Sequence, residues 1–381
     1  MRPTALGILC KQRGWTRARL IRELRTAAAT QQQSLPSDES LTRMIREWAN
    51  GRRGLSDFYA DLLSVVFGVP FSSGQADPEP TPTDGHARYV DQLPEQLTAS
   101  AAVDDQLIVV FESQTQALRV LDRQLGAVQL LAQTEAHVSH MSGLMRYSLP
   151  GSRRAALAAA VAEAAALAGW QALDLGDPLK SWQHHETAKA AALESGNPAI
   201  LAHVTAQQAY ALLDLGRQRD ALALVTSADS AKDRGPALLR SWLSAAKAEM
   251  AAAAGDEVPA RQALDDAFRS LPAEPTDPEL PFVVLDDIHL GRWRGHCLAR
   301  LGADDALNDL SAALSGLDPT FTRAASALHC DLALAHSVRG EHDLAQAEAR
   351  QADVLAARTG SERQRRRIRS LLTSGDQPKD R

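Results

Sequence analysis

The side chains best suited to chemistry gather in residues 37–53, SDESLTRMIREWANGRR. Leu41, Ile45 and Trp48 recur at helical spacing, so they share one face of a predicted helix. The other face and the residues after the helix carry hydroxyl and guanidinium groups: Ser40, Thr42, Arg43, Arg46, Arg52 and Arg53. A short amphipathic helix with hydrogen-bond donors outside and a basic exit fits the major groove of DNA.

Two carboxylates complicate this interpretation. Ser37 is a predicted N-cap, and Asp38 and Glu39 follow it in the first turn, where they favour the helix dipole but repel phosphates. They could read cytosine amino groups, or the helix could dock differently. The structural alternative is that Arg43 and Arg46 are simply solvated, and we favour DNA binding over it.

Charge is divided unevenly along the chain of 381 residues, which is long enough for two or three domains. Residues 1–67 hold 11 Lys and Arg against 6 Asp and Glu, a net charge of +5. The remainder holds 30 against 41, a net charge of −11. A basic head on an acidic body predicts a polyanionic partner for the head alone.

The cysteines and hydropathy bear on the cell compartment. Three cysteines, Cys10, Cys297 and Cys330, match neither a disulfide framework nor a metal spacing. No apolar signal region or run of 18 apolar residues occurs. We therefore expect a soluble cytoplasmic protein in a reducing compartment, with no membrane partner.

The pattern of residues 1–71 predicts four helices around one small core, with a polar loop over residues 26–36. The string GWTRARL…LTRMIREWANGRR…FYADLLSVVFGV resembles the Xre-type helix-turn-helix domain, in the long-loop form of actinobacterial regulators. It departs from that family in its longer loop and in Ala49, where Glu is usual. The resemblance implies that Thr42, Arg43 and Arg46 face base edges, and that further arginines approach phosphates: Arg17, Arg19, Arg52 and Arg53.

Two segments follow the head. Residues 72–100 hold four prolines and few apolar residues, so they predict a flexible linker. Residues 101–150 predict a long amphipathic helical segment, with a break near Gly126. Its predicted apolar face is made of residues at spacings of three and four: Leu107, Val110, Leu118, Leu121, Leu125, Val128 and Leu131.

Residues 151–373 contain a repeat with a period near 40. Each copy is marked by a glycine: Gly176, Gly216, Gly255, Gly302 and Gly340. Seven residues before each lies a small residue: Gly169, Ala209, Ala248, Gly295 and Ala333. The spacing resembles the tetratricopeptide repeat over residues 155–358, apart from few aromatics and an insertion at 272–281. The resemblance implies five helix pairs stacked into an α-solenoid with a concave groove.

In that family the first helix of each pair lines the groove. The aromatic, charged and histidine residues at the matching positions are the candidate effector-binding residues: Trp170, His203, Tyr210, Trp242, Glu249, His289, Arg292 and His296. The other positions are Glu163, Ala166, Ala206, Ala245, Ala327, Cys330 and Leu334. Such a set is typical of a pocket, but for any one residue packing between helices is the alternative. No asparagine falls at a groove position, which disfavours the peptide clamp of related sensors.

The C-terminal end has a run of arginines over residues 358–369, which could touch DNA or the acidic body but is more typical of a solvated helix end. We expect residues 374–381 to be a disordered tail. No phosphate-binding glycine loop, metal motif or catalytic set occurs, so neither an enzyme nor a cofactor or metal site is predicted.

These patterns together predict an all-α, sequence-specific transcriptional regulator. A head of this size buries only about 600–1,000 Å² on DNA, so we expect a homodimer on two half-sites. Besides DNA, the regulator would bind a protein, peptide or small-molecule effector in the groove. The alternative is a tetratricopeptide-type interaction scaffold whose head does not bind DNA. Neither the operator, the effector nor the sign of regulation follows from the sequence.

Overall fold

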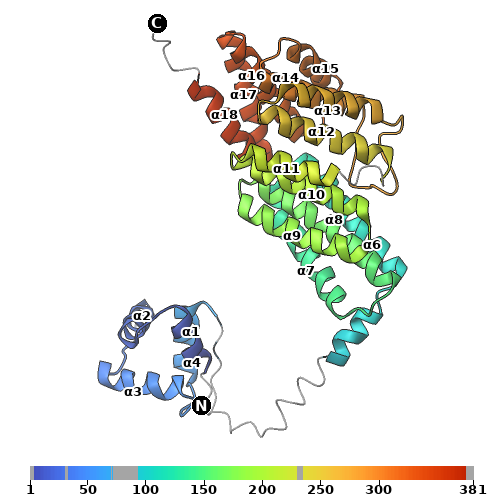
Figure 1. The fold of residues 1–381 in the computed structure, drawn as a ribbon. Helices are drawn as coiled ribbons and strands as arrows, with labels where there is room; N and C mark the ends of the chain where they lie inside the picture. Colours follow the sequence, from blue (N-terminus) through green and yellow to red (C-terminus); the bar gives the residue numbers. More distant parts are fainter. Residues whose placement is uncertain (1–3, 31–32, 70, 72–92, 230–234, 375–381) are drawn as a thin grey trace. The chain divides into compact units, whose positions relative to one another are not determined.

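The computed structural model describes residues 4–30, 33–69, 71, 93–229 and 235–374. All regular elements in these ranges are helices, as the all-α prediction requires (Figure 1). The chain divides into two compact units, Met1–Pro94 and Glu95–Arg381, which we call the head and the body.

The head contains α1 (Ala5–Gln12), α2 (Arg17–Thr30), α3 (Asp38–Ala49) and α4 (Asp57–Phe67). Ser37 caps α3 as predicted, because its hydroxyl accepts a hydrogen bond from the Ser40 amide at 3.4 Å. Leu41, Ile45 and Trp48 are all buried, and Trp48 packs on the Tyr59 ring with centroids 4.7 Å apart. The apolar face of α3 is therefore the one that the sequence indicates.

The loop predicted for residues 26–36 begins too early. Helix α2 continues to Thr30 through three alanines, which have the highest helix propensity. Ala28 is buried in the head core, so packing also favours the extra turn. Residues 31–32 lie outside the described residues.

The predicted linker, residues 72–100, also ends earlier than expected. Residues 93–101 are helical, and the Ser100 hydroxyl, which is buried, lies 3.0 Å from the Ser148 hydroxyl. Residues 72–92 lie outside the described residues, so the flexible tether stays a prediction.

The segment predicted as one long amphipathic stretch forms α6 (Asp105–Leu125), the 3-10 turn η1 (Ala127–Gln129) and α7 (Leu131–Tyr147). The break falls at Gly126, whose φ is +80° and where a Cβ would lie 2.0 Å from the Thr359 carbonyl oxygen. Only glycine fits both the turn and this close approach.

The predicted apolar face of α6 is only partly buried, because Leu118 is buried and Leu107 is half-buried but other members are exposed. Val110 and Leu125 are 57% and 49% exposed, whereas Ile108 and Phe111 are buried. The buried side also carries polar groups, namely Thr115, Arg119 and Asp122. The apolar periodicity misplaces part of this face because α6 turns Arg119 and Asp122 toward partners on α8 and α16.

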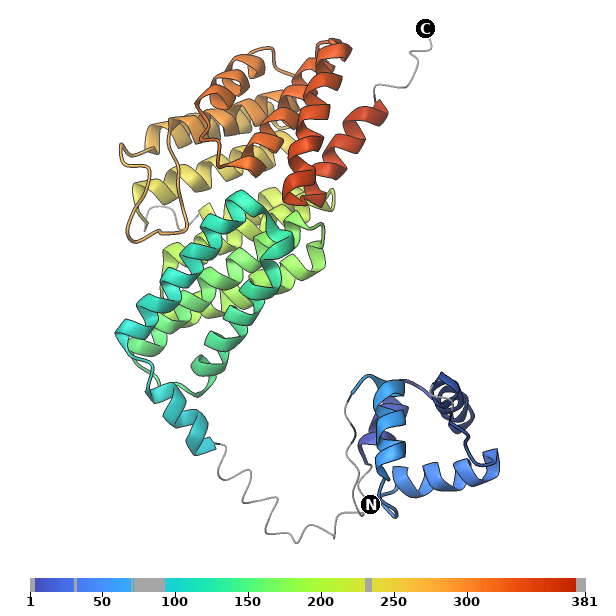
Figure 2. The ribbon, with the colours of Figure 1, turned by 180° about the vertical axis from the view of Figure 1, so that it is seen from behind.

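Five helix pairs follow, each packed as an adjacent pair (Figures 1 and 2). They are α8 (Ser152–Asp174) with α9 (Pro178–Ser195), α10 (Pro198–Asp214) with α11 (Gln218–Asp229), α12 (Ala237–Ala253) with α13 (Glu257–Ser270), α14 (Asp287–Leu301) with α15 (Ala306–Gly316), and α16 (Thr322–Val338) with α17 (His342–Thr359). A final helix, α18 (Glu362–Ser374), packs on α16, α17 and α8. This arrangement is an α-solenoid. The predicted tail, apart from Ser374, lies outside the described residues.

Small residues allow the helices of a pair to approach closely, as the repeat spacing predicts. A Cβ on Gly169 would lie 2.5 Å from the His185 ring, and a Cβ on Gly295 would lie 2.7 Å from Leu310. Ala209, Ala248 and Ala333 are likewise buried at the matching positions. Helix α8 is long and apolar enough to cross a membrane, but 72% of its most apolar window is buried, as in a core helix.

Three contacts tie distant parts of the body together. The Ser361 hydroxyl, just before α18, donates to Asp174 at 2.6 Å, and Arg366 donates to the Gly176 carbonyl at 2.8 Å. Arg323 on α16 forms an ion pair with Asp122 on α6. The last helices are therefore joined to α6 and to the first pair.

Candidate functional site

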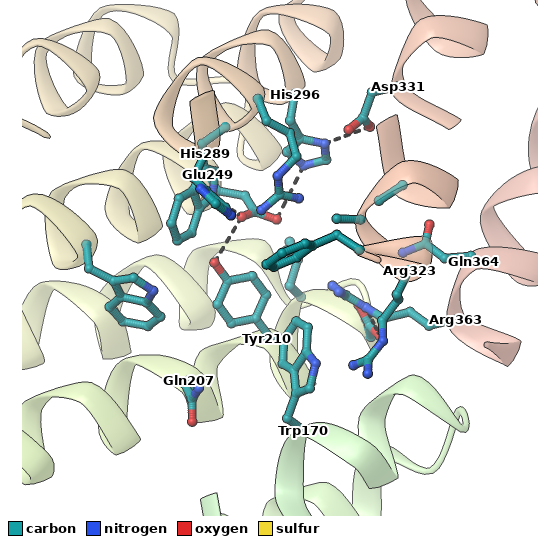
Figure 3. Close-up of a pocket in the computed structure, with 18 of the residues that line it drawn as sticks. Trp170, Gln207, Tyr210, Glu249, His289, His296, Arg323, Asp331, Arg363 and Gln364 are labelled. Atoms are coloured by element: carbon teal, nitrogen blue, oxygen red, sulfur yellow. Dashed lines mark hydrogen bonds and ion pairs between the residues drawn. The ribbon is translucent and has the colours of Figure 1, made fainter. Parts of the chain in front are cut away.

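A cavity of about 880 Å³ lies within the body, lined by α6, the first helix of each pair, α18 and the segment before α14 (Figure 3). All eight residues predicted as effector-binding line this one cavity: Trp170, His203, Tyr210, Trp242, Glu249, His289, Arg292 and His296. Of the other predicted groove positions, Ala206 and Ala245 do not line it. Whether the eight residues bind an effector stays a prediction.

Glu249 on α12 is a buried carboxylate that joins three helices. It accepts hydrogen bonds from the Tyr210 hydroxyl at 2.9 Å and from Trp293 Nε1 at 2.6 Å. Its other oxygen lies 3.3 Å from His296 Nε2. Burial alone would raise the pKa of Glu249, but His296, the charge of Arg363 and the hydrogen bond from Trp293 lower it, so the group is ionised.

His296 links Glu249 to Asp331 on α16. Its Nδ1 lies 2.7 Å from Asp331 Oδ1 (Figure 3). Arg367 on α18 also donates to this carboxylate. Burial opposes protonation, yet the two carboxylates raise the pKa of His296 above its ordinary value. Burial would raise the pKa of Asp331, but His296 and Arg367 lower it to about 2. The side chains form a buried chain of alternating charge.

Two further ion pairs cross the cavity wall. Arg119 lies 3.0 Å from Glu163, and both are nearly buried. Arg363 Nε on α18 donates to both oxygens of Asp214, at 2.8 and 3.0 Å. Buried pairs of this kind order helices rigidly because breaking one leaves an unpaired charge.

Aromatic rings form the remaining wall. The Trp170 and Tyr210 rings meet edge to face at 5.8 Å. His203 lies between Trp242, at 4.5 Å, and Phe282, at 4.4 Å between ring centroids. Burial lowers the pKa of His203 to about 3, so this ring is neutral and packs as an aromatic. For His203 the packing alternative therefore holds, although it also lines the cavity.

Several lining residues escaped the sequence analysis. Phe282 directly follows the insertion at 272–281 that interrupts the repeat, and its neighbour Val283 is buried. Arg363 and Arg367 belong to the C-terminal arginine run, and these two contact the acidic body, whereas Arg358 and Arg369 of the same run are exposed. Their spacing of four residues places both on one helix face, and this spacing was the sequence signal that could have predicted their shared contact with the body.

The predicted DNA-binding residues of the head lie on or near α2 and α3. Arg43, Arg46 and Arg52 are exposed and have no ion-pair partner within the described residues. Thr42 instead donates its hydroxyl to the Asp38 carbonyl at 2.7 Å. The arginines are thus available to a ligand, whereas the Thr42 hydroxyl already has a partner within its own helix.

The remaining predicted head residues differ in their contacts. Arg17 is exposed. Arg19 lies over the Trp15 ring at 5.1 Å, and Arg53 lies 3.7 Å from Glu47. The Ser40 hydroxyl accepts from that of Ser37 at 3.2 Å, within the helix cap.

Asp38, which the sequence suggests would repel phosphates, has a cationic partner. Arg25 on α2 donates to Asp38 Oδ1 through Nε at 2.9 Å and through Nη2 at 2.5 Å. Its charge is therefore partly compensated at the start of α3, whereas Glu39 has no ion pair among the described residues.

Comparison with known proteins adds little to this picture. No protein-family model matches the chain, and no curated protein matches it. Among solved structures, a crystal structure of Rap protein complexed with competence and sporulation factor is 13% identical, covers 96% of this chain and 99% of its own, and superposes with a TM-score of 0.47. Function must therefore be argued from this chain's own residues.

Proposed function

We propose that the chain is a DNA-binding transcriptional regulator of the Xre-like helix-turn-helix kind, whose helical-repeat body binds an effector. The observation that carries this proposal is the polarity of α3. Its inner face is packed through Leu41, Ile45 and Trp48. Its outer face presents Arg43 and Arg46, which have no carboxylate partner in the part of the chain that the structure describes. Guanidinium groups held on a helix of this size can pair with guanine edges in the major groove.

The surroundings of α3 support the same role. Arg52 follows the helix and Arg17 begins α2, and both side chains are exposed. Such residues contact phosphates, which set the position of the helix on DNA without reading its sequence. The body adds the cavity, where binding of an effector would change how the heads are presented.

The test is binding of the purified full chain to genomic fragments that include its own promoter. Wild type should select particular fragments, and the Arg43→Ala/Arg46→Ala double variant should lose that selectivity. A loss of about 1–3 kcal/mol is expected for each guanine contact. Arg22→Ala, an exposed arginine of α2 outside the predicted contacts, is the matched control. Equal selection by the double variant would contradict the proposal.

A second candidate is a protein-interaction scaffold, favoured by one observation in the body. The cavity is lined by the concave-side helices of a repeat array, a surface that such arrays use for binding. Here the head would be a docking domain. This candidate predicts no DNA binding at low salt, and it predicts capture of a partner that is lost when the cavity is blocked by Ala166→Trp.

The predicted homodimer stays part of the proposal. The outer side of α6 leaves Val110, Leu121 and Leu125 exposed. Sedimentation of the full chain, with and without DNA, would establish its oligomeric state.

A further inference from the structure

The cavity of the body is electropositive, although the body as a whole is acidic. Its lining contains eight arginines and five carboxylates. Residues 68–381 carry a net charge of −11, so the arginines are concentrated on this inner surface. A concave site walled by one sign of charge concentrates ligands of the opposite sign.

Every one of the five carboxylates already has a cationic partner. Asp122, Glu163 and Asp214 pair with Arg323, Arg119 and Arg363 respectively. Asp331 pairs with Arg367 and His296, and the same His296 lies beside Glu249. The lining therefore has no carboxylate left to balance its remaining guanidinium groups.

Arg292 on α14 is one of these remaining groups. Its Nε is buried and has no hydrogen-bond acceptor among the described residues. A buried donor without an acceptor is costly, typically about 1–3 kcal/mol, and invites a ligand atom to complete it. His289, three residues earlier, lies on the same helix face and also lines the cavity.

Arg123 on α6 is the second guanidinium group without a carboxylate partner. It has no ion pair within the described residues, and its guanidinium lies 5.4 Å from the centre of the Phe321 ring. The His289 ring lies 5.6 Å from the same Phe321 ring. Burial, and then the neighbouring charge of Arg119, lower the pKa of Arg123, which indicates an excess of positive charge at this place.

The rest of the wall is flat and aromatic. The ring centroids of Trp242 and Trp293 lie 5.9 Å apart. The Tyr210 ring contacts Trp170, while its hydroxyl donates to Glu249. Such rings favour a planar ligand, because offset and edge-to-face ring contacts add to the burial of apolar area. The cavity volume of about 880 Å³ lies in the range of small-molecule sites.

We propose that the cavity binds a small molecule that has a planar apolar body and an anionic group, a carboxylate or a phosphate, which Arg123 and Arg292 hold. The two guanidinium groups supply the charge, and the tryptophans contact the plane. This inference rests on the proposed effector-binding role of the body and names the class of its effector.

The test uses two fluorescent probes with one planar skeleton. Anilinonaphthalene sulfonate carries an anionic group, and N-phenylnaphthylamine lacks it. Both are titrated into the full chain, with energy transfer from tryptophan as the readout. Wild type should bind the sulfonate at least tenfold more tightly than the neutral probe, because only the sulfonate can accept charge-assisted hydrogen bonds.

Variants locate the site. Arg123→Gln and Arg292→Gln should each weaken sulfonate binding by about tenfold or more, with binding of the neutral probe unchanged. Arg292→Lys, which keeps the charge, should recover part of the loss. Arg294→Gln is the matched control, because Arg294 is on the same helix but lies 3.0 Å from Asp309 and does not line the cavity.

Competition then separates the two anion chemistries. Indoleacetate and adenosine monophosphate are compared with their uncharged counterparts, indoleacetamide and adenosine, as displacers of the sulfonate. Stronger displacement by either anion supports the inference and identifies the carboxylate or the phosphate. Equal displacement by charged and uncharged members of both pairs would overturn it.

Two other results would also overturn the inference: equal affinity of wild type for both probes, or equal loss of both probes in Arg123→Gln and Arg292→Gln. The DNA-binding test is independent of these titrations. A chain that selects DNA fragments but shows no preference for the anionic probe would retain the proposed regulator and lose this ligand class.

Discussion

The head and the body use arginine in opposite ways. In the head, Arg43 and Arg46 lie on the outer face of a helix whose inner face is packed, so their charge is exposed to solvent. In the body, Arg363 and Arg367 point inward and pair with Asp214 and Asp331. The same residue type thus offers charge to a partner in one unit and joins helices in the other. The role of each arginine depends on whether it lies on the outer or the inner face of its helix.

The cores differ in a related way. The head core is built from large side chains, such as Leu24, Leu62 and Phe67. The paired helices of the body instead meet through glycine and alanine, as at Gly169 against His185. Large apolar side chains are buried in the body as well, among them Leu238 and Leu243, and the concave side adds charged pairs between helices. We therefore expect the two units to respond differently to substitution.

The largest effect should follow removal of a buried carboxylate from the body. Asp331→Ala leaves His296 and Arg367 without their shared partner, and loss of one member of a buried pair typically costs about 3–5 kcal/mol. Urea unfolding of the full chain should show the body transition shifted and the head transition unchanged. Asp343→Ala, at an exposed position of α17, is the control. A shift no larger than that of the control would refute the structural importance of this charge chain.

Substitution in the head core should give the complementary result. Leu41→Ala removes a fully buried side chain of α3 and should lower the unfolding free energy of the head by about 2–5 kcal/mol. Val65→Ala, at a position that is 62% exposed on α4, should have little effect. Circular dichroism during urea unfolding resolves the two transitions. If Leu41→Ala shifted the body transition as well, the two units would not be independent.

Acid should weaken the body through His203, whose pKa in the folded state is about 3 against an ordinary 6.5. The unfolded chain therefore binds a proton that the folded body excludes, so the stability that His203 contributes is present above pH 6.5 and is lost as the pH falls toward 3. Between pH 6.5 and about pH 5 the loss is about 2 kcal/mol.

This prediction is checked by comparing the pH dependence of unfolding in wild type and His203→Phe. The difference isolates His203 from His296, whose raised pKa acts in the opposite direction, with stability present at low pH and lost as the pH rises. His203→Phe should have a flatter acid limb. Parallel curves would mean that His203 is not buried in its neutral form.

The smallest effect should come from the exposed pair at the start of α3. Arg25→Gln removes the partner of Asp38, and an exposed pair contributes only about 0.2–1 kcal/mol to stability. The expected functional change is a few-fold weaker affinity for DNA, because Asp38 then repels phosphates without compensation. Arg25→Gln/Asp38→Asn should restore the affinity. No recovery in the double variant would show that Arg25 acts by another route.

Much of the fold could be predicted because its signals are local. The small residues at fixed spacing predicted the five helix pairs, and the groove positions predicted eight residues that now line one cavity. The predictions that failed concern contacts with residues far away in the sequence. The buried side of α6 carries Arg119 and Asp122 because Glu163 and Arg323 meet them, and no periodicity within α6 records that.

The C-terminal arginines illustrate the same limit. Residues 363 and 367 look like a solvated helix end until Asp214 and Asp331, 149 and 36 residues away, are seen beside them. Phe282 likewise lines the cavity from the segment that directly follows the insertion at 272–281, which has no place in the repeat pattern. Long-range pairing of charges and the fold of an insertion are tertiary properties.

The most direct test of the central claim is the salt dependence of DNA affinity of the full chain, measured with wild type, Arg17→Gln/Arg52→Gln in the head and Arg300→Gln in the body. About six phosphate contacts predict that affinity falls about 10³-fold between 50 and 200 mM salt. The head variant should reduce that dependence, and the body variant, at an exposed arginine of the cavity lining, should not. An affinity independent of salt, or a dependence that Arg300→Gln lowers as much as the head variant does, would contradict DNA binding by the head.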